Sequence, residues 1–205
     1  YDSSLSTRNS IAINLFKAWY LPFYKYGIIH GDPHPGNYTI AKKGLCLNLL
    51  DFGCIRVFKA EFVSAVINLY IALRDNDKEL ALSAYESWGF KNLNKDLINT
   101  LNMWASYIYG PLLEDKKRQI QKEEGGSYGK EVASKVHKEL KRLGGVKPPR
   151  EFVLVDRAAI GLGSVFMHLK AEVNWHQMCE ELISNFSIKN LKKNQKQVLT
   201  KNKII

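Results

Sequence analysis

The chain has 205 residues, of which 45% are hydrophobic and 24% are charged, a composition typical of one globular domain with a substantial core. Charged or polar residues interrupt its apolar stretches before about 18 residues, so we expect no transmembrane segment, and the polar start YDSS is not typical of a signal peptide. Three cysteines without C-x-x-C spacing argue against a disulfide framework and favour a reducing compartment.

The net charge of +10 is concentrated in two segments, 116–150 and 187–205. Nucleic-acid-binding modules place basic residues on an ordered face among aromatic ones, and neither segment does so, so we expect no nucleic-acid partner. We interpret the first segment as the solvated face of a helix and the second as a basic flexible tail. Weak peripheral contact with an anionic membrane is the alternative.

The first predicted element is an apolar helix over residues 8–26. Ile11, Leu15 and Trp19 recur at helical spacing. Pro22 is expected to interrupt or end the helix, because proline lacks a backbone donor. The helix leads directly into the segment with the clearest motif.

Residues 30–37 read HGDPHPGN and predict a catalytic loop. Asp32 and Asn37 have the spacing of the loop H-x-D-x-x-x-x-N, in which the aspartate orients and deprotonates an attacking hydroxyl and the asparagine holds Mg²⁺. Pro33 and Pro35 disfavour helix at the residues before them and remove two backbone donors. We therefore expect a shaped turn.

A β-hairpin is predicted over 38–50, because two runs of strand-forming residues flank the sequence AKKG. It is followed by the D-F-G triplet 51–53, whose aspartate binds Mg²⁺ in kinase-like folds. Such a hairpin would return Asp51 beside Asn37, so we expect both to be magnesium ligands. Each motif alone is a weak match and could be only a strand end or a turn, but their order and spacing together favour a magnesium-phosphate site.

Hydrophobic periodicity after the D-F-G predicts a succession of helices, over 60–73, 78–88, 96–113, 130–143, 150–169 and 174–186. The fold class is therefore mainly α with one small β-hairpin, typical of the large (C-terminal) lobe of a protein-kinase-like fold. This lobe is expected over 1–186, with its helical part over 59–186. We expect the five-stranded small lobe to be absent, because only 29 residues precede His30.

A missing small lobe would leave apolar side chains uncovered near the hairpin. The expected candidates are Tyr24, Tyr38, Ile40 and Leu47.

The motifs at 30–37 and 49–56 resemble those of the UbiB/AarF (ADCK-type) family of atypical kinases, and residues 148–163, PPREFVLVDRAAIGLG, are similar to its C-terminal region. The resemblance covers the second half of that family's kinase-like domain. The family's K-x-G-Q extension, Ala-rich nucleotide loop and small-lobe Lys and Glu have no matching positions here.

The resemblance implies ATP and Mg²⁺ as cofactors and assigns roles to individual residues. Asp32 matches the catalytic aspartate, while Asn37 and Asp51 match the magnesium ligands. Phe52 and Gly53 complete the D-F-G on the cofactor-binding side. His34 stands where ordinary protein kinases have a lysine at the γ-phosphate, and we count it with the catalytic residues; a neutral imidazole there suggests chemistry different from protein phosphorylation.

The function implied is ATP hydrolysis or phosphoryl transfer that supports ubiquinone (coenzyme Q) biosynthesis, in the bacterial cytoplasm or the mitochondrial matrix. Expected partners are a nucleotide, a separate small-lobe chain and quinone-biosynthesis proteins. By itself the chain is expected to bind MgATP weakly and to be inactive. Two alternatives stay open: a phosphotransferase of the aminoglycoside/choline kinase type, which also uses an H-G-D-x-H-x-x-N loop, and a non-catalytic, pseudokinase-like interaction module.

Overall fold

The computed structural model describes residues 3–41, 46–121 and 127–203, and this part of the chain is mainly helical. Its α-helices are α1 (Leu5–Tyr26), α2 (Ala60–Asp75), α3 (Lys78–Trp88), α4 (Lys95–Tyr109), α5 (Ser127–Arg142), α6 (Arg150–Leu169), α7 (Trp175–Ile183) and α8 (Ile188–Lys201). Short 3-10 turns are η1 (Pro35–Asn37) and η2 (Gly110–Leu112). The strands are β1 (Ile28–His30), β2 (Tyr38–Ala41), β3 (Cys46–Leu49) and β4 (Ile55–Val57). The predicted mainly α fold class is confirmed.

Helix α1 passes through Pro22 and ends at Gly27, so the predicted break at the proline is wrong. Buried side chains on both sides of Pro22, including Trp19 and Phe23, hold the helix in the core despite one missing backbone donor. Gly27 takes a left-handed φ of 66°, and a Cβ there would lie 2.7 Å from the Phe58 carbonyl oxygen. The chain therefore turns sharply here into β1.

The predicted hairpin strands are confirmed, since β2 pairs with β3 in antiparallel register with Tyr38 opposite Leu49. Its turn, 42–45, lies outside the described residues. A second antiparallel pair, β1 with β4, places His30 opposite Ile55 and was not predicted. Strands of three residues are too short for a periodicity to be recognised. This second pair joins the start of the site loop to the end of the D-F-G.

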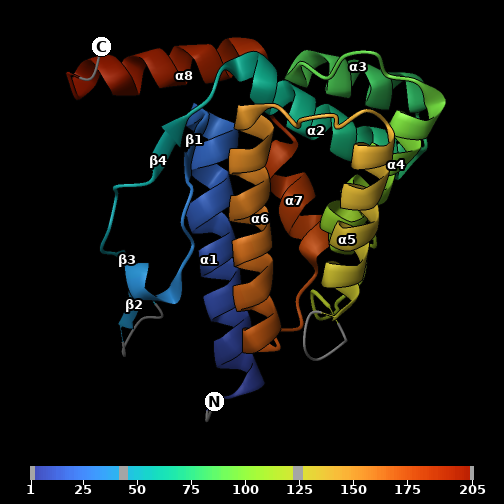
Figure 1. Cartoon of the computed structure of the whole chain (residues 1–205). Coiled ribbons are helices and arrows are strands. Elements are labelled where there is room, and N and C mark those ends of the chain that lie inside the picture. Colours follow the sequence, from blue (N-terminus) through green and yellow to red (C-terminus); the bar gives the residue numbers. More distant parts are fainter. Residues whose placement is uncertain (1–2, 42–45, 122–126, 204–205) are drawn as a thin grey trace.

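Helices α1 and α6 lie side by side through the middle of the fold, with the small sheets on one side and α4 and α5 on the other (Figure 1). Phe16 of α1, Phe166 of α6 and Trp175 of α7 form one aromatic cluster, with centroid separations of 4.7–6.5 Å.

The predicted helix 96–113 ends earlier, at Tyr109, and continues as the 3-10 turn η2, which contains Pro111.

The predicted flexible tail is wrong, because residues 188–201 form α8 and pack across α1 and α2 (Figure 1). Leu191 is fully buried, and Nε2 of Gln195 donates to the carbonyl oxygens of Tyr26 and Phe58 at 2.8 and 2.9 Å. Lys192 forms an ion pair with Glu61. The lysine-rich composition suggested a tail, but Leu191 and Leu199 supply an apolar face that outweighs it.

Helix α6 has the length and composition of a membrane-spanning helix, with a mean hydropathy of 1.5. Asp156 and Arg157 interrupt its apolar sequence, as expected, so the helix has this character only on average. The core helix of a soluble protein can have the same length and composition. Ala158, Leu162 and Phe166 bury one face of α6 in the core described above.

Candidate active site

His30 connects the two predicted motifs. The Asp32 N–H donates to Nδ1 of His30 at 3.1 Å, so the ring proton lies on Nε2, which donates to the Asp51 carbonyl at 2.7 Å. The His30 carbonyl accepts from Nε1 of buried Trp19 at 2.9 Å. His30 is almost fully buried, and its imidazole and backbone carbonyl together connect helix α1, the site loop and the D-F-G. Sequence reasoning missed the role of Trp19.

Asn37 is held against Asp32, the predicted catalytic carboxylate. Its Nδ2 donates to Oδ2 of Asp32 at 2.9 Å and to the Asp32 carbonyl at 3.1 Å. The amide oxygen of Asn37 therefore faces away from Asp32, and within the described residues no hydrogen bond occupies it. This contact orients the Asp32 carboxylate and leaves the amide oxygen of Asn37 available to a ligand.

His34 lies exposed at the start of η1, and its Nδ1 accepts from the Gly36 N–H at 3.0 Å. This bond requires an unprotonated Nδ1, so the neutral ring carries its proton on Nε2. An N–H that faces solvent beside Asp32 can donate to a phosphate oxygen. This geometry is compatible with the predicted role of His34 beside the γ-phosphate.

The D-F-G begins beside Asn37, because the Leu50 N–H donates to the Asn37 carbonyl at 2.9 Å. Oδ1 of Asp51 accepts from the Gly53 N–H at 2.8 Å, which fixes the carboxylate in a tight turn and leaves Oδ2 without a hydrogen bond among the described residues. Phe52 is 59% exposed. The structure thus brings together the two residues predicted to bind magnesium, through the hairpin that separates them in sequence.

The donor set fits Mg²⁺, which prefers a few carboxylate and carbonyl oxygens and completes its shell with water and phosphate. Asn37, which is half-buried, offers an amide oxygen, and Asp51, which is exposed, offers a carboxylate oxygen. The described part of the chain contains no group of three or more His, Cys, Asp or Glu side chains that could hold a metal ion. A Mg²⁺ ion held by these two oxygens would need water or phosphate oxygens to complete its shell.

The apolar surface near the hairpin differs from the predicted one. Tyr24 is buried, and Tyr38 and Leu47 pack against the core, because the hairpin folds down onto α1. Ile40 is exposed as predicted. The more exposed apolar side chains flank the D-F-G instead: Leu50, Phe52 and Val57 are 51–59% exposed.

Gly161 of α6 allows the helix to approach the site loop, a contact that sequence reasoning missed. A Cβ at this position would lie 2.5 Å from Cγ of Pro33, whose ring is rigid and buried. A Cβ at Gly163, two residues later, would meet no heavy atom within 4 Å.

These two glycines give a matched pair of variants. Gly161→Ala should lower the free energy of unfolding by about 1–3 kcal/mol, because overpacking displaces the loop. Gly163→Ala should raise it by about 0.5–1 kcal/mol through helix propensity. Urea unfolding of both variants measures the difference, and an equal gain in stability from both would show that α6 does not constrain the loop.

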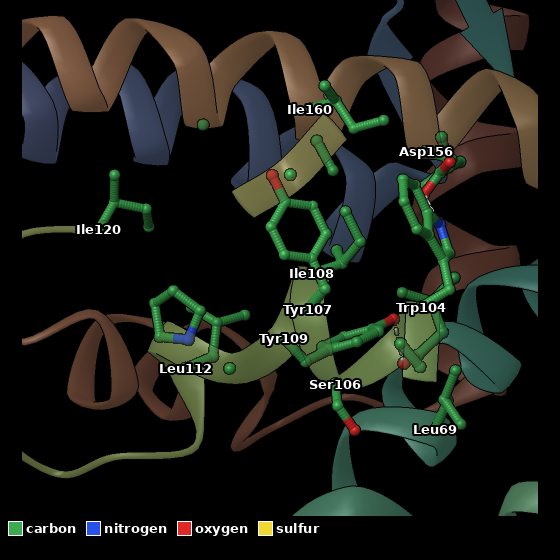
Figure 2. Close-up of a pocket in the computed structure, with 18 of the residues that line it drawn as sticks. Leu69, Trp104, Ser106, Tyr107, Ile108, Tyr109, Leu112, Ile120, Asp156 and Ile160 are labelled. Atoms are coloured by element: carbon green, nitrogen blue, oxygen red, sulfur yellow. Dashed lines mark hydrogen bonds between the residues drawn. The ribbon is translucent and has the colours of Figure 1, made fainter. Parts of the chain in front are cut away.

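A cavity of about 690 Å³ lies on the other side of α6, between α4, α6 and η2. Figure 2 shows Trp104 and Asp156 facing each other at one end of it, with Tyr107, Tyr109 and Leu112 along the wall. Nε1 of Trp104 donates to Oδ1 of Asp156 at 2.9 Å. Burial raises the pKa of the Asp156 carboxyl from 3.8 to about 6, although the bond from Trp104 acts in the opposite direction.

Because the raised pKa favours the protonated carboxyl in the folded state, Asp156 should make the protein less stable as the pH rises from about 4 to about 6. Asp156→Asn removes the charge and keeps an acceptor for Trp104. The free energy of unfolding of the variant should exceed that of the parent by up to about 3 kcal/mol at pH 7. At pH 4 the two values should be close. Urea unfolding at both pH values tests this, and a pH-independent difference would contradict it.

Residues 2–85 match the family model described as the ABC1 atypical kinase-like domain. The matched segment contains the site loop, both small sheets and the D-F-G, and it agrees with the resemblance found at these motifs. A comparison with curated proteins found no match. Residues 148–163 lie outside the matched segment, so their similarity to the same family stays a prediction.

Proposed function

We propose that this chain supplies the large-lobe half of an MgATP-dependent phosphotransferase or ATPase site, because residues 2–85 match the ABC1 atypical kinase-like domain and contain both predicted motifs. The observation that carries the proposal is the pair of contacts made by His30, which position Asp32 and Asp51 relative to each other. A kinase-type site needs these two carboxylates at one place for different tasks.

In the proposed mechanism, Asp32 accepts the proton of an acceptor hydroxyl or of water, and the bond from Asn37 holds its carboxylate in position. Oδ1 of Asn37 and Oδ2 of Asp51 would hold Mg²⁺, which would supply charge neutralisation of the phosphates. Nε2–H of His34 donates to a phosphate oxygen, in place of the lysine ammonium of ordinary protein kinases.

The strand Lys, helix Glu and phosphate-covering loop of a complete kinase fold would come from a small lobe outside the described residues. The exposed side chains of Leu50, Phe52 and Val57 surround the D-F-G, where such a lobe would rest. We further propose that the assembled site serves ubiquinone biosynthesis, the role that the similarity to UbiB/AarF proteins implies.

A non-catalytic interaction module is the second candidate, because the described residues contain two two-stranded sheets and no five-stranded lobe. A nucleotide-binding titration of the chain, with and without Mg²⁺, separates the two. The phosphotransferase proposal expects weak ATP binding that requires Mg²⁺. Binding that is absent, or equal without the metal, would favour the module.

A further inference from the structure

A groove of about 710 Å³ lies between the site loop, the first half of α1 and the second half of α6. Its volume is that of a pocket for a small organic ligand. The loop contributes Asp32 and His34 to the groove, whereas Asn37 and residues 51–53 do not line it. The groove therefore includes the predicted catalytic residue but neither of the predicted metal ligands.

Two arginines give this groove positive charge. Arg8 of α1 donates from Nη1 to the Ser3 carbonyl at 2.6 Å, and its Nε is buried without a hydrogen-bond partner. Arg157 of α6 is exposed at the groove and, among the described residues, has no carboxylate within ion-pair distance. Asp32 contributes the negative charge among the residues that line the groove. With two arginines and one carboxylate, the lining carries a net positive charge.

The remaining wall combines one further polar group with apolar side chains. Nδ1 of His168 donates to the Ser164 carbonyl at 2.7 Å, so its Nε2 is available to a ligand. Apolar side chains from α1 and α6 also line the groove, among them Ile11 and Leu169. A buried guanidinium N–H without an acceptor is costly, and an anionic ligand group would satisfy it.

We propose that this groove binds the phosphoryl acceptor and that the acceptor is an anionic amphiphile. Its anionic group binds Arg8 and Arg157, its apolar body packs against Ile11 and Leu169, and its hydroxyl reaches Asp32. The acceptor role rests on the proposed function, whereas binding of the amphiphile does not. In the transfer step the hydroxyl oxygen forms a bond to the γ-phosphorus of ATP, the bond from that phosphorus to the β–γ bridging oxygen breaks, Asp32 takes the hydroxyl proton and ADP leaves.

The test uses dodecyl phosphate below its critical micelle concentration, with dodecanol and inorganic phosphate as the two partial probes. Calorimetric titration of the chain, without nucleotide or Mg²⁺, should show binding of dodecyl phosphate at least about tenfold tighter than either partial probe. Arg8→Gln and Arg157→Gln should each weaken it about tenfold, a typical loss for one charge-assisted contact. Arg56→Gln, on β4 and away from the groove, should leave it unchanged.

No binding of dodecyl phosphate, equal affinity for dodecanol or for inorganic phosphate, or unchanged affinity in both groove variants would overturn the proposal. Asp32→Asn should bind the probe at least as tightly as the parent, because a negative charge leaves the groove. Since no nucleotide or metal is present, this result is independent of whether the metal site functions.

Discussion

Substitution of Asp32 by Asn is expected to lower turnover about 10²–10⁴-fold in an intact enzyme that contains this chain. The amide cannot accept the proton of the attacking hydroxyl. Asn retains an oxygen that can accept from Nδ2 of Asn37, so the loop should keep its conformation and nucleotide affinity should change little. Steady-state ATP turnover and nucleotide affinity measured on the same preparation separate the two effects.

Asp77→Asn is the matched control, because Asp77 caps α3 by accepting from the N–H groups of Glu79 and Leu80, and Asn caps equally well. It should leave turnover unchanged. Full turnover in Asp32→Asn would remove Asp32 from the mechanism.

His30→Ala should have the largest effect on stability, a loss of about 2–4 kcal/mol in the free energy of unfolding. The substitution leaves the Asp32 N–H without its acceptor, removes the bond to the Asp51 carbonyl and opens a space beside the Trp19 ring, whose centroid lies 5.6 Å from that of His30. Urea unfolding of the chain measures the loss.

His34→Ala is the control for the same loop. Each of the two histidines accepts a backbone N–H two residues further on, but His34 is exposed and, among the described residues, makes no hydrogen bond to the D-F-G. Its substitution should cost less than about 1 kcal/mol. Equal losses in the two variants would mean that His30 does not connect the motifs.

Much of the fold could be predicted from the sequence, because local signals determine it. Asp77 and Gly89 bound α3 as N-cap and left-handed C-cap, and α6 spans the residues that its periodicity predicted. Tertiary contacts caused the errors. Helix α1 continues past Pro22 because Trp19 before the proline and Phe23 after it are buried in the core. Helix α8 is ordered by the contacts of Leu191 and Gln195 with the rest of the fold.

In the candidate site, too, the features set by local sequence could be predicted, whereas contacts between distant segments could not. The motif spacing placed Asn37 beside the D-F-G, and the hairpin pairing of Tyr38 with Leu49 bears out that proximity. The contacts that hold the site together come from distant segments and leave no local pattern. Trp19 donates to the His30 carbonyl across 11 residues, and Gly161 meets Pro33 across more than a hundred. A glycine inside an apolar helix was the available signal for the second contact.

Binding of Mn²⁺ in place of Mg²⁺ tests most directly whether the site loop and the D-F-G form one metal-phosphate site. Electron paramagnetic resonance of the chain titrated with Mn²⁺ should show one bound ion in the presence of ATP, strongly weakened in Asp51→Asn and unchanged in Asp77→Asn. Nucleotide-dependent Mn²⁺ binding that survives Asp51→Asn, or no binding by the parent chain at millimolar ATP, would contradict the site.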